Sequence, residues 1–333
     1  MTVTKKTTLI AEGGSGTGPR VVHKGNDGIW LNYNPQRSGG VKSGNMQHIR
    51  GVTGRPATQT GKIGTWDIGD CLCKVDRLGA RLKRFKIAVI NPNGVQLFLL
   101  SAQGRLHGGF AYGGLNVRVH PPLIERLGEK EAVEAARQWA DQWMLQLPTP
   151  RDVVRCERVS RIDYAVDIIV EKGGPDDYGP AVHEQLISRL QHPQAFWVTG
   201  WEIGRGGADK NRLERVIVSY DKFQERWDNK QYGGLQEYVT SLNNPSLVVH
   251  SDGCVTEGDG NKAMRVWRIE FRFHRSFLKG KEISDADEAI AAMPALVAVA
   301  CQTTRLHQRC ATGNVFPTNR ETEIWNLVKN TVM

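Results

Sequence analysis

The chain has 333 residues, enough for one large or two modest domains with a sizeable hydrophobic core. Its longest apolar stretch, AIAAMPALVAVACQTT, contains a proline and falls short of the roughly 20 residues that cross a bilayer, so it predicts a buried helix and no membrane segment. The six cysteines form no C-x-x-C pair and no apolar signal sequence opens the chain, so we expect a cytoplasmic protein.

The positive charge is concentrated in the first third of the chain. The net charge is +9, but residues 1–110 hold 16 basic and 5 acidic residues (+11), which leaves 28 basic and 30 acidic residues (−2) for the rest. Clusters such as RLGARLKRFK would attract a polyanion, above all the phosphates of nucleic acid. The alternative is an ordinary solvated helix face.

The chain divides into three segments by composition. Residues 1–60 form a basic leader rich in Gly and Ser, which we expect to be at most partly ordered and to contribute little to the fold. Residues 61–150 contain short strand-like runs and then a helix over 129–147, whose apolar residues recur at helical spacing. Residues 151–333 contain further strand-like runs and end in helices.

Strands and helices are mixed in this last segment. After the strand RVSRIDYAVDIIV we expect a helix over 180–191, then the strands RVIVSYDK and RVWRIEFRFHR, and helices from about residue 284. The order predicts an α+β fold with a mostly antiparallel central sheet flanked by helices.

The segment RIDYAVDI places charged residues inside an apolar, β-prone run. Because strand side chains alternate between faces, Arg161, Asp163 and Asp167 share one face. In RVWRIEFRFHR the same alternation puts Glu270 on a polar face opposite an aromatic one.

If the two strands are neighbours, Asp163, Asp167 and Glu270 would converge, and three carboxylates repel one another unless a divalent cation or protons offset them. The alternative is a solvated sheet face with cross-strand pairs of arginine and carboxylate.

Tyr220 ends the strand RVIVSY and is followed by Asp221 and Lys222. We expect Tyr220 and Lys222 to share a strand face. An isolated tyrosine is ordinary sheet packing, and a phenol with a pKa of about 10 becomes a nucleophile only beside a cation, a metal or a base.

Several other kinds of site have no support in the sequence. There is no GxxxxGK[ST] phosphate loop, and the nine histidines include no pair separated by a single residue, which excludes the paired-histidine motif of HUH nucleases. Histidines and cysteines also lack zinc-site spacings, so any metal would be held mainly by oxygen ligands, which favours Mg²⁺ or Mn²⁺.

In order, SRIDYAVDI, WEIGRGGADKNRLERVIVSYDKFQER and VWRIEFRFHR resemble the replication initiation factor (Rep_trans) family, the initiators of rolling-circle plasmids and related phage and mobile elements. The resemblance covers residues 95–280 and includes the glycine-rich segment GRLHGGFAYGGLNVRVH. It implies that residues 61–150 are the N-terminal half of a Rep-like region and residues 151–333 its catalytic half with C-terminal helices. GRGGADKN departs from the G-S-R-x-S-like stretch of the family, and Val218 stands where the family often has the arginine of R-x-Y-[DE]-K. These departures leave the phosphate-contacting positions less well matched than the tyrosine.

The resemblance implies a metal-dependent endonuclease and strand transferase that nicks and rejoins origin DNA through a 5′-phosphotyrosine intermediate. Carried over to this sequence, it makes Tyr220 the nucleophile and Asp163, Asp167 and Glu270 the metal ligands. Lys222 and Arg161 become electrostatic helpers. Tyr232 and Tyr238 are rival nucleophiles.

The resemblance also implies partners. The substrate would be origin DNA that is single-stranded, cruciform or supercoiled, a superfamily 1 helicase would assist, and a homodimer is possible. A conjugative relaxase shares this chemistry, and a non-catalytic DNA-binding regulator would account for the basic first third alone.

Overall fold

The computed structural model describes most of the chain, with gaps. The described residues are 18–33, 58–60, 72–78, 83–90, 96–104, 112–143, 156–174, 177, 186–188, 194–196, 200–204, 215–258, 262–306 and 321–332. Contacts between residues divide the chain into two compact units, each assembled from separate stretches. Unit 1 comprises Met1–Thr7, Asn26–Ile162 and Phe277–Ala291, and unit 2 comprises Thr8–Gly25, Asp163–Ser276 and Ala292–Met333.

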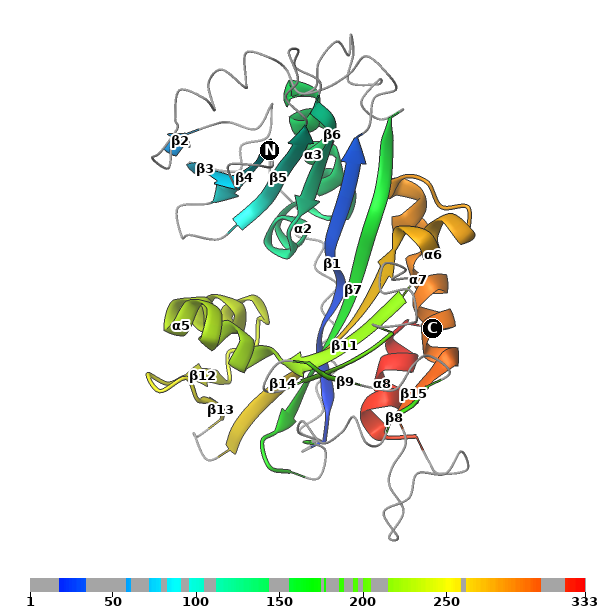
Figure 1. Cartoon of the computed structure of the whole chain (residues 1–333). Coiled ribbons are helices and arrows are strands. Elements are labelled where there is room, and N and C mark those ends of the chain that lie inside the picture. Colours follow the sequence, from blue (N-terminus) through cyan, green and yellow to red (C-terminus); the bar gives the residue numbers. More distant parts are fainter. Residues whose placement is uncertain are drawn as a thin grey trace. The chain divides into compact units, whose positions relative to one another are not determined.

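Unit 1 contains an antiparallel sheet with the strand order β2-β3-β4-β5-β6-β1 (Figure 1). Its elements are β1 (Arg20–Tyr33, which begins in unit 2), β2 (Thr58–Thr60), β3 (Leu72–Leu78), β4 (Lys83–Ile90), β5 (Gln96–Gly104), β6 (Tyr112–Val119), α2 (Pro121–Leu127) and α3 (Glu129–Trp143). The next strand in the order, β7 (Glu157–Glu171), begins in unit 1 and continues into unit 2.

The two helices cover one face of the unit 1 sheet. Leu31 of β1 lies opposite Val117 of β6, and both are fully buried. Phe98 of β5 contacts Trp139 of α3, with ring centroids 5.4 Å apart. The apolar half of each alternating strand therefore packs against the helices and forms the core of this unit.

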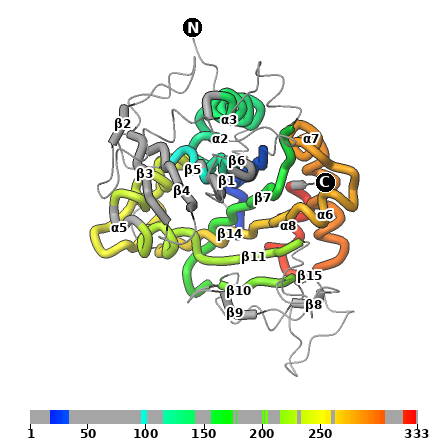
Figure 2. Tube along the Cα trace, turned by 45° about the horizontal axis from the view of Figure 1, so that its top comes forward, coloured from blue at the N-terminus to red at the C-terminus, as the bar shows by residue number. Residues whose placement is uncertain are grey.

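Unit 2 is built on the strands β7-β14-β11-β10-β9. Its elements are β9 (Gln194–Phe196), β10 (Gly200–Ile203), β11 (Arg215–Asp221), α5 (Lys222–Ser241), β12 (Leu247–Val249), β13 (Val255–Glu257), β14 (Lys262–His274), α8 (Glu323–Val332), and the separate pair β8 (Leu186–Ser188) and β15 (Thr304–Leu306). Two helices, α6 (Arg275–Gly280) and α7 (Ala286–Thr303), contribute residues to both units. Figure 2 follows the same path along the chain.

Helices cover both faces of the unit 2 sheet. On one face, α5 packs Leu235 and Val239 against Ile169 of β7 and Val266 of β14. On the other face, Phe271 of β14 contacts Trp325 of α8, with ring centroids 6.4 Å apart. Side chains on both faces of β14 are therefore buried, including charged ones.

The predicted α+β class is confirmed, and every strand pair whose register is defined is antiparallel. The helix predicted over 129–147 is α3, of which the structure describes residues up to Trp143. The apolar stretch with Pro294 is the helix α7, but only one of its faces is buried, with Met293 and Val297 in the core and Pro294 exposed. The structure describes no helix long and apolar enough to cross a membrane.

Three local predictions differ from the structure. The leader contains a 14-residue strand, β1, in the middle of the sheet. The prediction that the leader contributes little to the fold was therefore wrong. The helix predicted over 180–191 is a strand at Leu186–Ser188, because this segment pairs with β15; its other residues lie outside the described part. Lys222 begins α5 and does not share a strand face with Tyr220. The three-segment division of the chain stays a prediction.

Candidate active site

A buried ion pair joins the two central strands of unit 2. The Arg268 guanidinium of β14 donates from Nε to Asp167 Oδ1 over 2.7 Å and from Nη2 to Oδ2 over 2.6 Å. The side chains are 1% and 0% exposed. Burial alone would raise the pKa of Asp167, but the charge and hydrogen bonds of Arg268 outweigh it and hold the pKa at about 2.

Tyr238 of α5 completes this network from above the sheet. Its phenol donates to Asp167 Oδ2 over 2.6 Å. Burial and the Asp167 carboxylate both raise the pKa of Tyr238 well above its ordinary value. The phenol is therefore a firm hydrogen-bond donor to Asp167, and Tyr238, which like Tyr220 lies beside a carboxylate held by an arginine, stays the rival nucleophile that the test below separates from Tyr220. The side chain of its other rival, Tyr232, lies outside the described residues.

The neighbouring carboxylate on β14 has its own guanidinium. Arg272 donates from Nε and Nη2 to the two oxygens of Glu270 over 2.8 and 2.9 Å. Glu270 is 3% exposed. Burial would lower the pKa of Arg272, but Glu270, and to a smaller extent Asp163, raise it.

The register of the strands explains why Asp163 acts on Arg272. The Lys172 amide donates to the Ala263 carbonyl and Asp167 binds Arg268, so residue numbers rise along β7 as they fall along β14. Asp163 precedes Asp167 by four residues in β7, and Arg272 follows Arg268 by four residues in β14. This antiparallel register therefore places Asp163 opposite Arg272.

Tyr220 lies beside this second pair. It is opposite Arg268 in the β11–β14 register, and its phenol is 3.5 Å from Glu270 Oε2, at the outer limit of a hydrogen bond. Its ring packs with Val216 and Val218, and only 6% of the residue is exposed. Catalytic hydrogen bonds are often long before substrate binds, so the geometry suits a phenol poised beside a base.

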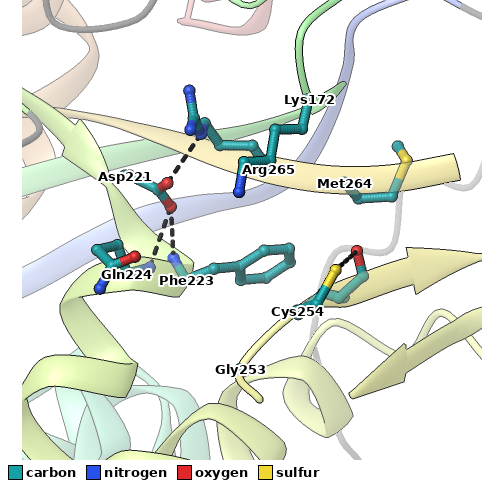
Figure 3. Close-up of a pocket in the computed structure, with 9 residues that line it drawn as sticks. Lys172, Asp221, Phe223, Gln224, Gly253, Cys254, Met264 and Arg265 are labelled. Atoms are coloured by element: carbon teal, nitrogen blue, oxygen red, sulfur yellow. Dashed lines mark hydrogen bonds and ion pairs between the residues drawn. The ribbon is translucent and has the colours of Figure 1, made fainter. Parts of the chain in front are cut away.

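The turn from β11 into α5 fixes the position of Lys222. Asp221 caps the helix by accepting from the amides of Phe223 and Gln224 over 3.0 and 3.1 Å, and it pairs with Arg265 at 2.8 Å (Figure 3). The Lys222 ammonium therefore turns back to 5.4 Å from the Tyr220 ring centroid and 2.8 Å from Glu225.

A pocket lies beside this cap. It is lined by Lys172, Arg265 and Cys254 among others, and its volume of about 40 Å³ holds no more than a few water molecules.

Of the six predicted site residues, the structure brings together Tyr220, Glu270 and Lys222, with Asp163 opposite the arginine that holds Glu270. Asp167 instead belongs to the Arg268 pair. Arg161 lies in unit 1, where its guanidinium is 4.1 Å from the centroid of the Trp30 ring. Its role as an electrostatic helper stays a prediction.

The predicted convergence of three carboxylates on one ion was wrong. Asp163, Asp167 and Glu270 are all described, and nowhere in the described part of the chain do three His, Cys, Asp or Glu side chains form a group that could hold a metal. The physical reason is that Asp167 and Glu270 each have their own arginine, so guanidinium groups offset these carboxylates. The alternative of a cross-strand pair of arginine and carboxylate is confirmed for Arg268 and Asp167, but the pair is buried and not solvated.

A magnesium ion often uses only one or two protein carboxylates and completes its shell with water and substrate phosphates. Glu270 and Asp163 both act on Arg272 beside Tyr220, and Glu270 would have to release an oxygen from Arg272 to bind an ion. Asp167 is less suited than Glu270, because both its oxygens bind Arg268 and Oδ2 also accepts from Tyr238. Whether the protein uses Mg²⁺ or Mn²⁺ stays a prediction.

Sequence reasoning did not assign the partners Arg268, Arg272 and Tyr238. The alternation of RVWRIEFRFHR placed both arginines on the face of Glu270, so a signal for them existed. The helix start also had one: Asp221 is followed three residues later by Gln224, a pattern typical of an N-terminal cap. No local pattern could reveal Tyr238, which reaches Asp167 from 71 residues away.

No protein-family model matches the chain, and no curated protein matches its sequence. One solved structure is similar to it: a rolling circle replication initiator protein from Geobacillus stearothermophilus, with 14% sequence identity over 95% of this chain and 97% of that one, and a TM-score of 0.40. A likeness this distant carries no argument about function, so we infer function from the side chains.

Proposed function

We propose that this chain nicks and rejoins DNA as a rolling-circle replication initiator, with Tyr220 as its nucleophile. The observation that carries the proposal is the Tyr220 phenol 3.5 Å from Glu270, a carboxylate that Arg272 holds by both oxygens. A phenol is scarcely ionised at neutral pH, and a fixed carboxylate can take its proton.

In the proposed step, the Tyr220 oxygen attacks a DNA phosphorus, forms the new P–O bond of a 5′-phosphotyrosine and displaces the 3′-oxygen of the preceding nucleotide. The phenolic proton passes to Glu270, and the leaving 3′-oxygen takes a proton from water. Rejoining is the reverse, with a 3′-hydroxyl attacking the phosphotyrosine. Arg272 and Lys222 would offset the negative charge that builds on the phosphate oxygens.

We include Mg²⁺ or Mn²⁺ in the proposal, held by Glu270 and Asp163. When bound, such an ion polarises the scissile phosphate as a Lewis acid. Asp167 is assigned a different role, in which its pair with Arg268 positions β7 against β14 beside the tyrosine. The substrate is DNA; a superfamily 1 helicase and a homodimer stay predictions from the family resemblance.

One observation favours a second candidate, a non-catalytic DNA-binding regulator. Tyr220, Glu270 and Asp163 are 6%, 3% and 1% exposed, which a purely structural network would also produce. A conjugative relaxase shares the chemistry of the first proposal and differs only in the fate of the nicked strand.

The test uses a supercoiled plasmid that carries the DNA surrounding the chain's own coding sequence. The full-length protein with Mn²⁺ should relax it, and a chelator should stop the reaction. Tyr220→Phe keeps the ring that packs with Val218 and loses the nucleophilic oxygen, so nicking should fall by about 10³-fold or more while DNA binding persists.

Tyr238→Phe and Tyr232→Phe are the matched controls and should keep nicking. Mass spectrometry of the DNA-linked peptide should place the adduct on Tyr220. An adduct on another tyrosine, or undiminished adduct in Tyr220→Phe, would show that the nucleophile is misassigned. Tight DNA binding with no nicking under any divalent ion would instead support the regulator.

A further inference from the structure

One face of the unit 1 sheet lies away from the core that α2 and α3 cover. Trp30 lies directly opposite Arg118 across β1 and β6, and Asn32 lies opposite Asn116. Residues opposite each other in a sheet share a face, so these four form two polar rows. The rows continue along the register into β5, where Arg118 lies opposite Leu99 and Asn116 opposite Ser101. The apolar rows of the same strands belong to the other face, which α2 and α3 cover.

Two arginines flank the Trp30 ring on this face. The guanidinium carbons of Arg118 and Arg161 lie 4.5 and 4.1 Å from the Trp30 ring centroid. The three residues come from adjacent strands, β6, β7 and β1, and the Ser160 hydroxyl donates to the Trp30 carbonyl over 3.0 Å at the same point. All three side chains are half-buried, which leaves part of each exposed.

Gly28 lets the ring lie along its own strand. A Cβ added at Gly28 would come within 2.8 Å of Cζ3 and 2.9 Å of Cη2 of Trp30. The indole therefore occupies the space above Gly28, two residues away on the same face, and lies on the sheet surface. A flat aromatic ring on a sheet, flanked by planar cations, is a surface on which a base can stack.

We propose that this face of unit 1, centred on Trp30, Arg118 and Arg161, is a binding platform for single-stranded DNA. A base would stack on the indole or on a guanidinium plane. The guanidinium N–H groups project from the edges of their planes, so an arginine that stacks can still donate to a phosphate.

The described cations at the ring favour a polyanion. Arg118 and Arg161 place two guanidinium groups against Trp30. Residues 1–110, which contain β1 to β5, carry a net charge of +11. Duplex DNA hides its base faces, so the stacking groups favour a single strand.

The platform deepens the proposed function, because it names single-stranded DNA as the form that the enzyme holds. It rests on the proposed function only in taking DNA as the nucleic acid that binds. All its residues belong to unit 1, and none is in the proposed catalytic machinery except Arg161, whose helper role is separate. The test measures binding in the Tyr220→Phe chain, so it does not depend on nicking.

Fluorescence anisotropy with a labelled oligo(dT) of about 20 nucleotides, and with a duplex of the same length, reports the two affinities. Trp30→Ala should weaken oligo(dT) binding by about 10- to 100-fold, the range expected for loss of one base–aromatic stack, and should change duplex binding by less than about threefold. Trp30→Phe should restore most of the affinity.

Two further variants distinguish the effect of the Trp30 ring from an effect on folding or on charge. Gly28→Ala pushes the far end of the indole aside and leaves both arginines in place, so it should reproduce much of the Trp30→Ala loss. Arg118→Gln should weaken binding to both DNA forms and reduce its salt dependence. Lys262→Gln, an exposed cation of unit 2, is the matched charge control and should change oligo(dT) binding little.

Far-UV circular dichroism and thermal melting establish that each variant is folded; if Trp30→Ala is not, Gly28→Ala and Trp30→Phe carry the test. The platform is refuted if the folded ring variants bind oligo(dT) as tightly as the parent. It is equally refuted if single-strand and duplex binding fall together in them, which would indicate backbone charge without stacking. Failure of wild-type nicking with an intact Trp30 effect would overturn the proposed function alone.

Discussion

Replacing Arg268 with methionine should destabilise the protein strongly at neutral pH. The substitution keeps a long unbranched side chain but leaves the Asp167 carboxylate, which is 0% exposed, without its cation. Removing one partner of a buried pair typically costs about 3 to 5 kcal/mol. The depression of the Asp167 pKa from 3.8 to about 2 corresponds to a contribution of about 2 kcal/mol, so the two magnitudes agree in order.

The loss of stability in Arg268→Met should increase as the pH rises. In the parent protein the depressed pKa means that the Asp167 contribution is full above pH 3.8 and is lost as the pH falls through about 2. In Arg268→Met, burial without the guanidinium raises the pKa of Asp167, so the folded variant loses stability as the pH rises above the unfolded value. The difference between the two proteins should therefore widen between about pH 4 and pH 7.

Urea unfolding followed by circular dichroism at pH 4.5 and pH 7 measures this difference. Lys262→Met is the matched control on the same strand, since its pair with Glu171 is 48% and 40% exposed and should contribute less than about 1 kcal/mol. Adding Asp167→Asn to Arg268→Met removes the charge and keeps an acceptor for Tyr238, so it should recover part of the loss. An Arg268→Met cost equal to that of Lys262→Met, or one independent of pH, would refute the reasoning.

Two further outcomes are expected from other contacts. Asp221→Ala removes the side-chain cap of α5 and should lower the free energy of unfolding by about 1 kcal/mol, with Asp221→Asn losing less; equal stability of all three in urea titrations would contradict the capping role. Affinity for single-stranded DNA should fall by about 50- to 2,000-fold between 50 and 200 mM salt if roughly 4 to 8 phosphates are neutralised, and an affinity that is flat across that range in a salt titration would contradict a mainly electrostatic interface.

The sequence predicted the elements with a strong local signal. RVSRIDYAVDIIV and RVWRIEFRFHR are β-prone runs and are the central strands of unit 2, although both of their faces are largely buried, and the helical spacing in 129–147 identified α3. The pattern failed for β1, whose first half is only half-buried and whose Gly25 has a φ of 154°, so it resembles a loop when read alone. Its position between β6 and β7 depends on long-range pairing that local composition does not encode.

The candidate site was predicted in its residue types but not in its pairings. Alternation identified which side chains share a face with Glu270, and its partner Arg272 lies only two residues further along the same strand. The pair of Asp167 with Arg268 joins two strands and residues 101 apart, so no local pattern indicates it. Trp30 belongs to no motif of the sequence, because its two arginines come from strands far along the chain.

The order in which the chain is synthesised bears on the interleaving of the two units. Helix α3 of unit 1 uses Arg137 to bind Glu157 and also Asp287, and the amide of Ala286 donates to Glu157. On the ribosome, residues up to at least 287 must therefore be synthesised before these contacts of unit 1 can form. Until then Arg137 and Glu157 lack the partners that α7 supplies, so translation of nearly the whole chain precedes completion of either unit.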